Sequence, residues 1–212
     1  PTVEPIDPVR YLGNRSSGKQ GHAIAEALAA AGAEVVLISG NVTLPTPAGV
    51  TLVNALTTEA MLAAVDEALP ADIFVGAAAV ADWKMTHVAS QKIKKHDAVT
   101  KLTLELMPTV DILAHVGTHK KRPALVIGFA AETEKLAESA RAKRLKKQCD
   151  WVVANNVSGG SVFGEDDNEV LVVTAASEHA WPRMSKRAIA AKLVHAIAEH
   201  VSHLPLKKGK AS

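Results

Sequence analysis

The residues with the clearest chemical potential form a short run rich in glycine, serine and amide side chains. Asn14-Arg-Ser-Ser-Gly-Lys-Gln-Gly21 lies between a short apolar segment and an Ala-rich segment that predicts a helix. Its Ser16-x-Gly18-x-x-Gly21 spacing matches the dinucleotide fingerprint, with Ser in place of the first Gly. Gly18 would let the backbone approach a ligand, Gly21 would let the helix pack on a sheet, and free N–H groups at a helix start bind anions. The run predicts a phosphate-binding turn, and the alternative is a tight turn that binds nothing.

A nicotinamide cofactor fits the sequence less well than a phosphate does. Dehydrogenases with this fingerprint usually carry an acidic residue about 20 positions further on. The corresponding stretch, Leu37–Asn41, offers neither a carboxylate nor an Arg. Tyr11 is the only Tyr of the chain, so a Tyr-x-x-x-Lys pair for hydride chemistry cannot follow. The main rival interpretation is a dinucleotide-dependent oxidoreductase, and a second is a regulatory nucleotide-binding or dimerisation module without turnover.

Other reactive side chains give weaker patterns. Basic clusters at Lys92–Lys95 and Arg141–Lys147 suit a compact phosphate-bearing ligand. His115 and His119 are spaced i, i+4 and could share a metal ion, but no third ligand is evident, so we predict no metal site. Cys149 has basic neighbours that could lower its pKa, but no base accompanies it, so we expect a buried structural thiol.

Composition excludes several classes of protein. The 212 residues carry 24 Lys plus Arg against 22 Asp plus Glu, and aromatic residues make up 3%, which is a poor basis for binding nucleic acid. The longest apolar run, 73–81, is far shorter than a membrane-spanning helix. A single Cys points to a reducing compartment, so we expect a cytoplasmic protein. The Pro-Thr-Val-Glu-Pro start indicates a segment cut from a longer chain.

Strands and helices that alternate along the chain must position these residues. The pattern predicts an α/β fold with a doubly wound, mostly parallel Rossmann-like sheet and helices on both faces. We expect a flap near 83–101, where the sequence is polar and irregular, one domain over 1–205, and a disordered tail at 206–212. The predicted strands are 9–12, 34–39, 50–53, 73–80, 124–129, 151–155 and 170–174, and the predicted helices are 22–31, 57–69, 133–147 and 185–202.

Five segments in this order together resemble one enzyme family, the bacterial phosphopantothenoylcysteine synthetases. They are Glu4-Pro-Ile-Asp-Pro-Val-Arg10, Asn14-x-Ser-Ser-Gly-Lys-x-Gly21, Gly76-Ala-Ala-Ala-Val-Ala-Asp82, Lys92-Ile-Lys-Lys95 and Gly128-Phe-Ala-Ala-Glu-Thr133. The resemblance extends from Val3 to about His200. In bacteria this domain is usually the C-terminal half of a bifunctional protein that begins with a flavin-dependent decarboxylase.

The resemblance implies a ligase of coenzyme A biosynthesis. CTP would activate 4′-phosphopantothenate as an acyl-cytidylate with loss of pyrophosphate, and L-cysteine would then displace CMP to form the amide. Mg²⁺ is expected on the triphosphate with few protein ligands. The resemblance also implies a homodimer whose site is completed by the partner chain, with small-molecule substrates and neither nucleic acid nor membrane as partner.

The resemblance assigns the catalytic roles to Asn14, Lys92 and Arg10. Asn14 would hold the acyl intermediate and the substrate, Lys92 would stabilise the departing pyrophosphate, and Arg10 would serve the second half-reaction. Without the resemblance, Asn14 would be a turn residue in the left-handed conformation, Arg10 a surface salt bridge and the lysines a solvated charge run.

Further contacts are implied by position. Phe129 would stack on the cytosine ring, and Lys143 and Lys147, on one helix face, would bind the triphosphate. The alternatives in which these residues bind no ligand are core packing for Ala77, a helix cap for Asp82 and helix-dipole complementation for the two lysines. Departures from the family pattern are Pro108-Thr109, Trp83 and Asn156. The implied nucleotide contacts are Gly76, Ala77, Ala78, Asp82, Lys92, Val110, Asp111, Ile112, Leu113, Phe129, Lys143, Lys147 and Asn155, and the implied phosphopantothenate contacts are Asn14, Ser16, Gly18, Ala78, Ala79 and Asp82.

Overall fold

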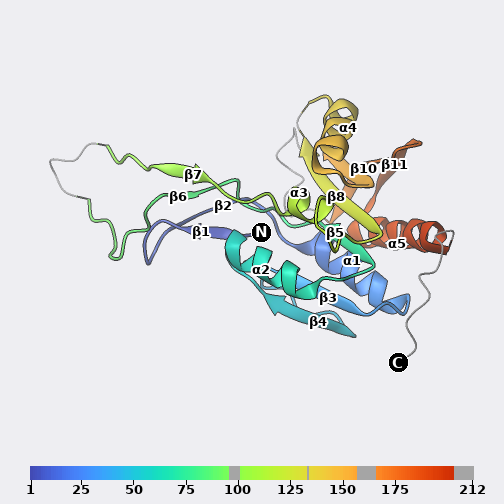
Figure 1. Cartoon of the computed structure of the whole chain (residues 1–212), viewed down its shortest axis with the longest axis horizontal. Coiled ribbons are helices and arrows are strands. Elements are labelled where there is room, and N and C mark those ends of the chain that lie inside the picture. Colours follow the sequence, from blue (N-terminus) through green and yellow to red (C-terminus); the bar gives the residue numbers. More distant parts are fainter. Residues whose placement is uncertain (96–100, 133, 157–165, 203–212) are drawn as a thin grey trace.

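The computed structural model describes residues 1–95, 101–132, 134–156 and 166–202 (Figure 1). The predicted tail at 206–212, the domain end at 205, flap residues 96–100 and Thr133 lie outside this part of the chain. Within it, no helix is both long and apolar enough to cross a membrane.

The centre of the fold is a five-stranded sheet in the order β11-β10-β9-β8-β5 (Figure 1). Strands β5 (Ile73–Gly76), β8 (Leu125–Glu132) and β9 (Trp151–Asn156) are parallel neighbours. Strands β10 (Asp167–Val173) and β11 (Glu178–Ser185) extend the sheet in antiparallel fashion. The predicted α/β class is confirmed. Strand β11 was not predicted, because its polar sequence, which includes a proline, lacks the apolar alternation of a strand.

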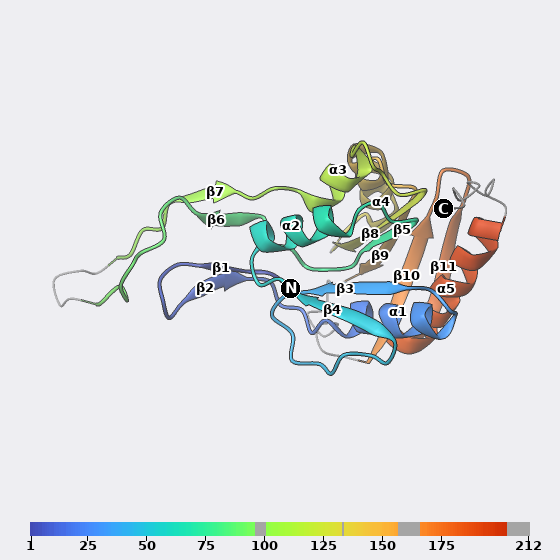
Figure 2. The same ribbon diagram turned by 60° about the horizontal axis from the view of Figure 1, so that its bottom comes forward.

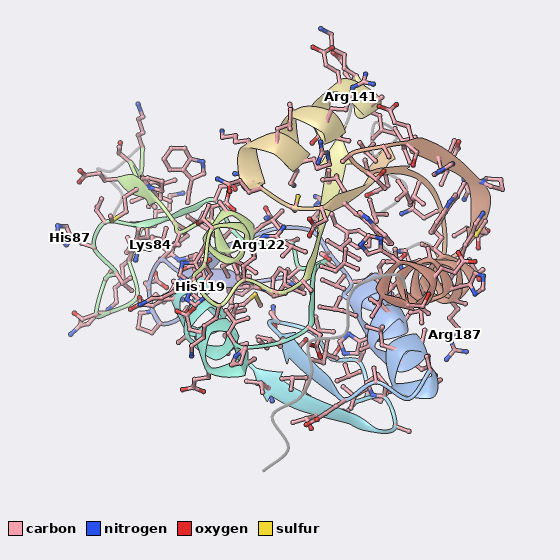
Figure 3. The ribbon with its side chains drawn as sticks, turned by 45° about the vertical axis from the view of Figure 1, so that its right-hand side comes forward. Lys84, His87, His119, Arg122, Arg141 and Arg187 are labelled. Carbon is pink, nitrogen blue, oxygen red and sulfur yellow. The ribbon has the colours of Figure 1, made fainter. Side chains whose placement is uncertain are left out.

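Helices cover both faces of the sheet, as the doubly wound fold requires. Along β8, Leu125 and Ile127 face α1 (Lys19–Ala30) and α5 (Lys186–Ser202), which lie side by side (Figure 3). Val126 faces the opposite core, which includes α2 (Thr58–Ala68), α3 (Ile112–Gly117) and α4 (Leu136–Lys147). These strand residues are 0% exposed, so β8 is a buried strand between two helical layers. Helix α3 was not predicted, because it is only six residues long.

Strands β3 (Val35–Ser39) and β4 (Val50–Asn54) were predicted as members of the main sheet, but they form a separate parallel pair. The pair contacts α1 and α2 rather than extending the row that ends at β5 (Figure 2). The strand predicted at 73–80 ends at Gly76, because the following alanines have low strand propensity. Residues 77–82 are therefore a loop at the carboxyl end of β5.

Two short antiparallel pairs project from the body and form what we call the arm, residues 3–13, 83–95 and 101–108 (Figures 1 and 2). One pair is β1 (Val3–Pro5) with β2 (Tyr11–Gly13), and the other is β6 (Trp83–Met85) with β7 (Leu106–Pro108). The irregular flap predicted at 83–101 thus begins with a strand, and the strand predicted at 9–12 is β2. The arm exposes large apolar side chains: Val9, Tyr11, Trp83, Val88, Leu102, Leu106 and Met107.

Candidate active site

A cleft of about 820 Å³ opens where the start of α1 meets the carboxyl ends of β5, β8 and β9. This edge is where doubly wound sheets bind ligands. The predicted site residues that line it are Asn14, Ser16, Gly18, Gly76, Ala77, Ala78, Ala79, Asp82, Val110, Asp111, Ile112, Leu113, Phe129, Lys143, Lys147 and Asn155. Arg10 and Lys92 are the predicted residues that do not line this cleft.

The start of α1 supplies the anion-binding part of the cleft. Gly18 is the N-cap, with φ 73° and ψ −8°, and it has no side chain to cap the helix. Ser17 Oγ accepts the Lys19 N–H at 3.5 Å. The first turn contains no acidic residue, so its N–H groups face the cleft without an internal anion. Glycine is required at 18 by its positive φ and by Val42, whose Cγ2 would lie 2.7 Å from an added Cβ. The packing role predicted for Gly21 is wrong, because an added Cβ there would meet only Ala77 at an ordinary 3.9 Å.

Asn14 joins this turn to the loop after β5. Its Nδ2 donates a hydrogen bond to the Val80 carbonyl at 3.0 Å, and its Oδ1 accepts none within the described residues. The left-handed alternative for Asn14 is wrong, because the described non-glycine residues with positive φ are Lys135 and Gln148. The side chain therefore has an anchored donor and a free acceptor at the rim of the cleft, which suits contact with a polar substrate.

The opposite wall carries the aromatic and basic groups. Phe129 and Asn155 lie on the neighbouring parallel strands β8 and β9. The Lys147 ammonium forms an ion pair with the Asp111 carboxylate, whose other oxygen accepts the Ala114 N–H at 2.9 Å and caps α3. Burial raises the pKa of Asp111, but the Lys147 hydrogen bond, the Ala114 N–H and the charges of Lys147 and Lys143 hold it below its usual range. One cleft lysine thus has an internal carboxylate partner that an entering phosphate must compete with.

The loop after β5 fixes Asp82 at the cleft rim. Its backbone carbonyl accepts the Thr109 N–H at 2.9 Å, and its exposed carboxylate makes no hydrogen bond or ion pair within the described residues. Asp82 is followed by β6, so the helix-cap alternative is wrong. The Pro108-Thr109 departure brings Thr109 against the backbone of residues 81 and 82, which keeps this loop in place.

Arg10 and Lys92 lie on the arm, where a buried carboxylate organises both. The fully buried Asp7 side chain accepts hydrogen bonds from Arg10 Nε at 3.0 Å, from Arg10 Nη2, and from the backbone N–H groups of Val9, Arg10 and Ile93. Arg10 Nη2 also donates to the Ile93 carbonyl at 2.6 Å. We call this group, Asp7, Arg10 and Ile93, the Asp7 clamp. It holds the segment that carries the exposed Lys92, so Arg10 is more than the expected surface salt bridge.

The charged form of Asp7 is strongly favoured by these contacts. Burial alone would raise the pKa of Asp7, but the hydrogen bonds from Arg10 and from the amides of Ile93, Val9 and Arg10 hold it well below its usual range. The clamp is therefore a charged, fully bonded unit at neutral pH.

Sequence reasoning missed part of the cleft lining. Lys186 begins α5, is buried and lines the cleft together with Asn168 and Gln20. Gln20 Nε2 donates to the Lys186 carbonyl at 3.2 Å, and its buried Oε1 has no hydrogen-bond partner within the described residues. These residues meet because α1 packs against α5, and no local sequence signal indicates that contact.

Cys149 is buried, as expected. Burial raises the pKa of its thiol above the ordinary value, so its basic neighbours do not make it a reactive thiolate.

Comparisons with known proteins agree on one family. The family model described as "DNA/pantothenate metabolism flavoprotein C-terminal domain" matches residues 1–201. The coenzyme A biosynthesis bifunctional protein CoaBC of Haemophilus influenzae is 43% identical over 94% of this chain and 50% of its own length. The CoaBC of Escherichia coli is 46% identical over 81% of this chain and 43% of its own length. The chain therefore spans about half the length of the curated relatives it matches.

Solved structures show the same fold. A crystal structure of the C-terminal domain of CoaBC superposes with a TM-score of 0.80 and 35% identity, covering 95% of this chain and 92% of that one. A Cab2 mutant in complex with phosphopantothenate-cysteine superposes with a TM-score of 0.72 at 16% identity, covering 95% and 85%. At that identity the second likeness concerns the fold alone.

Proposed function

Because the chain belongs to the family of DNA/pantothenate metabolism flavoprotein C-terminal domains, we propose that it is a CTP-dependent phosphopantothenate–cysteine ligase. Its place would be in coenzyme A biosynthesis, the process named for its relatives. The observation that carries the proposal is one cleft that combines the glycine-capped start of α1, small side chains at 76–79, Phe129 and two lysines.

The proposed reaction has two steps. A carboxylate oxygen of 4′-phosphopantothenate attacks the α-phosphorus of CTP, an O–P bond forms, and the bond to the pyrophosphate leaving group breaks. The neutral amine of L-cysteine then attacks the acyl carbon, CMP leaves with the anhydride oxygen, and the amine proton passes to solvent. Activation is needed because a carboxylate is a poor electrophile. The protein's contribution is to align the reactants and to stabilise negative charge.

In this proposal each wall of the cleft has its own task. The start of α1, with Gly18 at its cap, binds a phosphate through backbone N–H groups. Phe129 stacks on the cytosine ring, and Lys143 and Lys147 bind the triphosphate once a phosphate oxygen replaces Asp111 beside Lys147. Asn14 bonds the acyl phosphate through a neutral amide, which adds no charge that would repel an anhydride.

The cleft also fits a magnesium ion carried by the nucleotide. Mg²⁺ prefers carboxylate and phosphate oxygens and usually takes few protein ligands. Asp82 offers a carboxylate with no side-chain partner in the described part of the chain, whereas Asp111 is paired with Lys147. Asp82 is therefore the residue that would hold the ion, whose chemistry would be to neutralise charge on the triphosphate.

The site is completed by a second copy of the chain. Arg10 and Lys92 do not line the cleft of their own chain, and they lie on an arm that projects from the body (Figure 1). The same arm exposes Tyr11 at 57% and Trp83 at 54%, an apolar surface of the kind that protein interfaces cover. In a homodimer, the arm of one protomer would bring Lys92 to the triphosphate bound by its partner.

The relatives indicate what the full-length protein contains besides this domain. They are named bifunctional, and this chain spans about half of their length, which supports fusion to another domain. We propose that this other domain is a flavin-dependent decarboxylase. We further propose one synthetase domain over 1–205, a cytoplasmic location and only small-molecule substrates.

The proposal is tested with a panel of nucleotides and 4′-phosphopantothenate, by measuring pyrophosphate release and product mass before and after cysteine is added. The account predicts an acyl-cytidylate first and phosphopantothenoylcysteine with CMP after cysteine. A change in nicotinamide absorbance with NADPH, without pyrophosphate release, would instead support the oxidoreductase. Nucleotide binding without any turnover would support the regulatory module.

A further inference from the structure

A cluster of metal-ligating side chains lies outside the cleft, at the ends of two helices. Asp66 comes from the last turn of α2, His115 from the last turn of α3, and His119 follows Thr118, the C-cap of α3. One ligand atom of each lies within 4.8 Å of the others. His115 Nε2 is 2.7 Å from Asp66 Oδ1, and His119 Nε2 is 4.0 Å from the same oxygen. The sequence shows only the histidine pair. The structure adds Asp66, which lies 49 residues before His115 in the chain.

The support around the cluster is rigid. Arg122 lies beside α3 with His119 (Figure 3), and its guanidinium donates to the carbonyls of Gly117 and Pro123 and to Asp150 Oδ2 at 2.9 to 3.1 Å. These bonds fix the turn that presents His119. Both helices also end here, and the partial negative charge at helix C-termini favours a cation. The positions of the ligands are therefore set by packed elements rather than by a free loop.

We propose that Asp66, His115 and His119 form a binding site for one divalent transition-metal ion of the zinc type. Two imidazoles and one carboxylate are a common protein ligand set for such an ion, which would keep a fourth position for water. Imidazole ligands favour zinc, nickel, copper or cobalt over magnesium. The half-exposed Asp66 leaves a path for the ion and its water, while the histidines are more covered. This site is independent of the proposed ligase reaction, because none of its residues lines the cleft.

Binding requires two local changes, and one of them provides a signature. The ion must take the place of the proton shared by His115 and Asp66. In addition, His119 Nδ1 accepts the Lys121 N–H at 3.0 Å, so the neutral ring carries its proton on Nε2. Coordination through Nε2 moves that proton to Nδ1, and the Lys121 N–H must turn from the ring to water. Lys121 is exposed, so water can replace the lost acceptor.

The test is a titration of the metal-stripped chain with zinc chloride, followed by calorimetry. We expect wild type to bind one equivalent of zinc. Three variants should each raise the Kd for zinc about tenfold or more: Asp66→Asn, His115→Gln and His119→Gln. That is at least the effect of removing a residue that only supports a metal ligand. His195→Gln is the matched control, because His195 also faces an acidic partner, Glu199, at 3.4 Å on α5. It should leave this equivalent unchanged. In wild type, the backbone amide resonance of Lys121 should shift with the same stoichiometry.

Three results would overturn the proposal: no zinc binding by wild type, binding that survives in all three variants, or loss that is as large in His195→Gln. Melting temperatures without metal show whether each variant folds. If a variant does not fold, the Lys121 amide resonance of wild type shows whether zinc binds at this cluster. Zinc bound at another site would leave the chemical shift of that resonance unchanged.

Discussion

The cleft and the arm differ in how far their residues are buried and packed. The cleft lies at the edge of a sheet whose strand β8 is 0% exposed at Leu125, Val126 and Ile127, and helices cover both faces. The arm consists of strand pairs three residues long, carries exposed Tyr11 and Trp83, and is tied together by the Asp7 clamp between the β1–β2 turn and Ile93. The cleft walls thus come from packed elements of one chain, whereas the arm reaches the cleft only through Trp83 and Pro108 and carries Lys92 outside it.

The difference shows how one chain can divide a reaction between a fixed and a delivered part. In the proposed mechanism, nucleotide binding belongs to the cleft, which Phe129, Lys143 and Lys147 line. In that mechanism, charge stabilisation by Lys92 belongs to the arm and needs a second copy. Variants in the two regions should therefore fail in different ways.

The largest effect is expected at the cleft, from Asn14→Asp. A carboxylate beside the acyl phosphate repels the developing charge, so pyrophosphate release should fall about 100-fold or more, the size of losing one stabilising donor. Asn54→Asp, an exposed change at the end of β4, is the matched control and should retain the wild-type rate. Normal turnover in Asn14→Asp would remove Asn14 from the mechanism.

On the arm, Lys92→Gln should slow amide formation about tenfold, because it removes one cation from a site that stabilises a transition-state anion. Lys101→Gln, which changes another exposed arm lysine, should have little effect on the same assay of product mass against time. An unchanged rate in Lys92→Gln would mean that Lys92 is a solvated surface residue without a role in the reaction.

A binding assay sharpens the distinction. Phe129→Leu should weaken CTP about fivefold, the equivalent of about 1 kcal/mol of lost stacking. Phe74→Leu removes a ring of the same size from β5; Phe74 packs next to Gly76 but does not itself line the cleft, so its CTP affinity in calorimetry should stay close to wild type. Equal loss in both variants would mean that the effect comes from the core.

The smallest effect on rate is expected from Asp7→Asn, which acts through the position of Lys92. The neutral amide cannot accept the bonds from Arg10 as the carboxylate does, so hydrogen exchange at 89–95 should speed up while amide formation slows about twofold to threefold. Asp72→Asn, at an exposed carboxylate before β5, is the control. Exchange at 89–95 that matches wild type would refute the clamp.

The Asp7→Asn variant should also differ from wild type in how its stability depends on pH. The folded pKa of Asp7 is depressed, so the unfolded state binds more protons, and the stabilisation by Asp7 is present above about pH 4 and is lost as the pH falls further. The difference in free energy of unfolding between wild type and Asp7→Asn should therefore shrink on acidification, as measured by denaturant titration. A difference that grows on acidification would contradict the assignment.

The sequence predicts the cleft far better than the arm, for physical reasons. Alternating strands and helices place the ends of β5, β8 and β9 at one edge, so most of the implied residues gather there. Three-residue strands such as β6 and β7 carry no readable periodicity. Lys186 and Asp66 could not be predicted as neighbours of Gln20 and His115, because those contacts join elements far apart in the chain.

The most direct test of the central claim, that the arm of one protomer completes the cleft of another, is a mixing experiment. Asn14→Asp and Lys92→Gln proteins, each impaired alone, are unfolded together, refolded and assayed for phosphopantothenoylcysteine. A mixed dimer holds one site with an intact cleft and an intact arm, so random assortment should restore about a quarter of wild-type activity. If the mixture is no more active than its two components, Lys92 serves the cleft of its own chain and the account is contradicted.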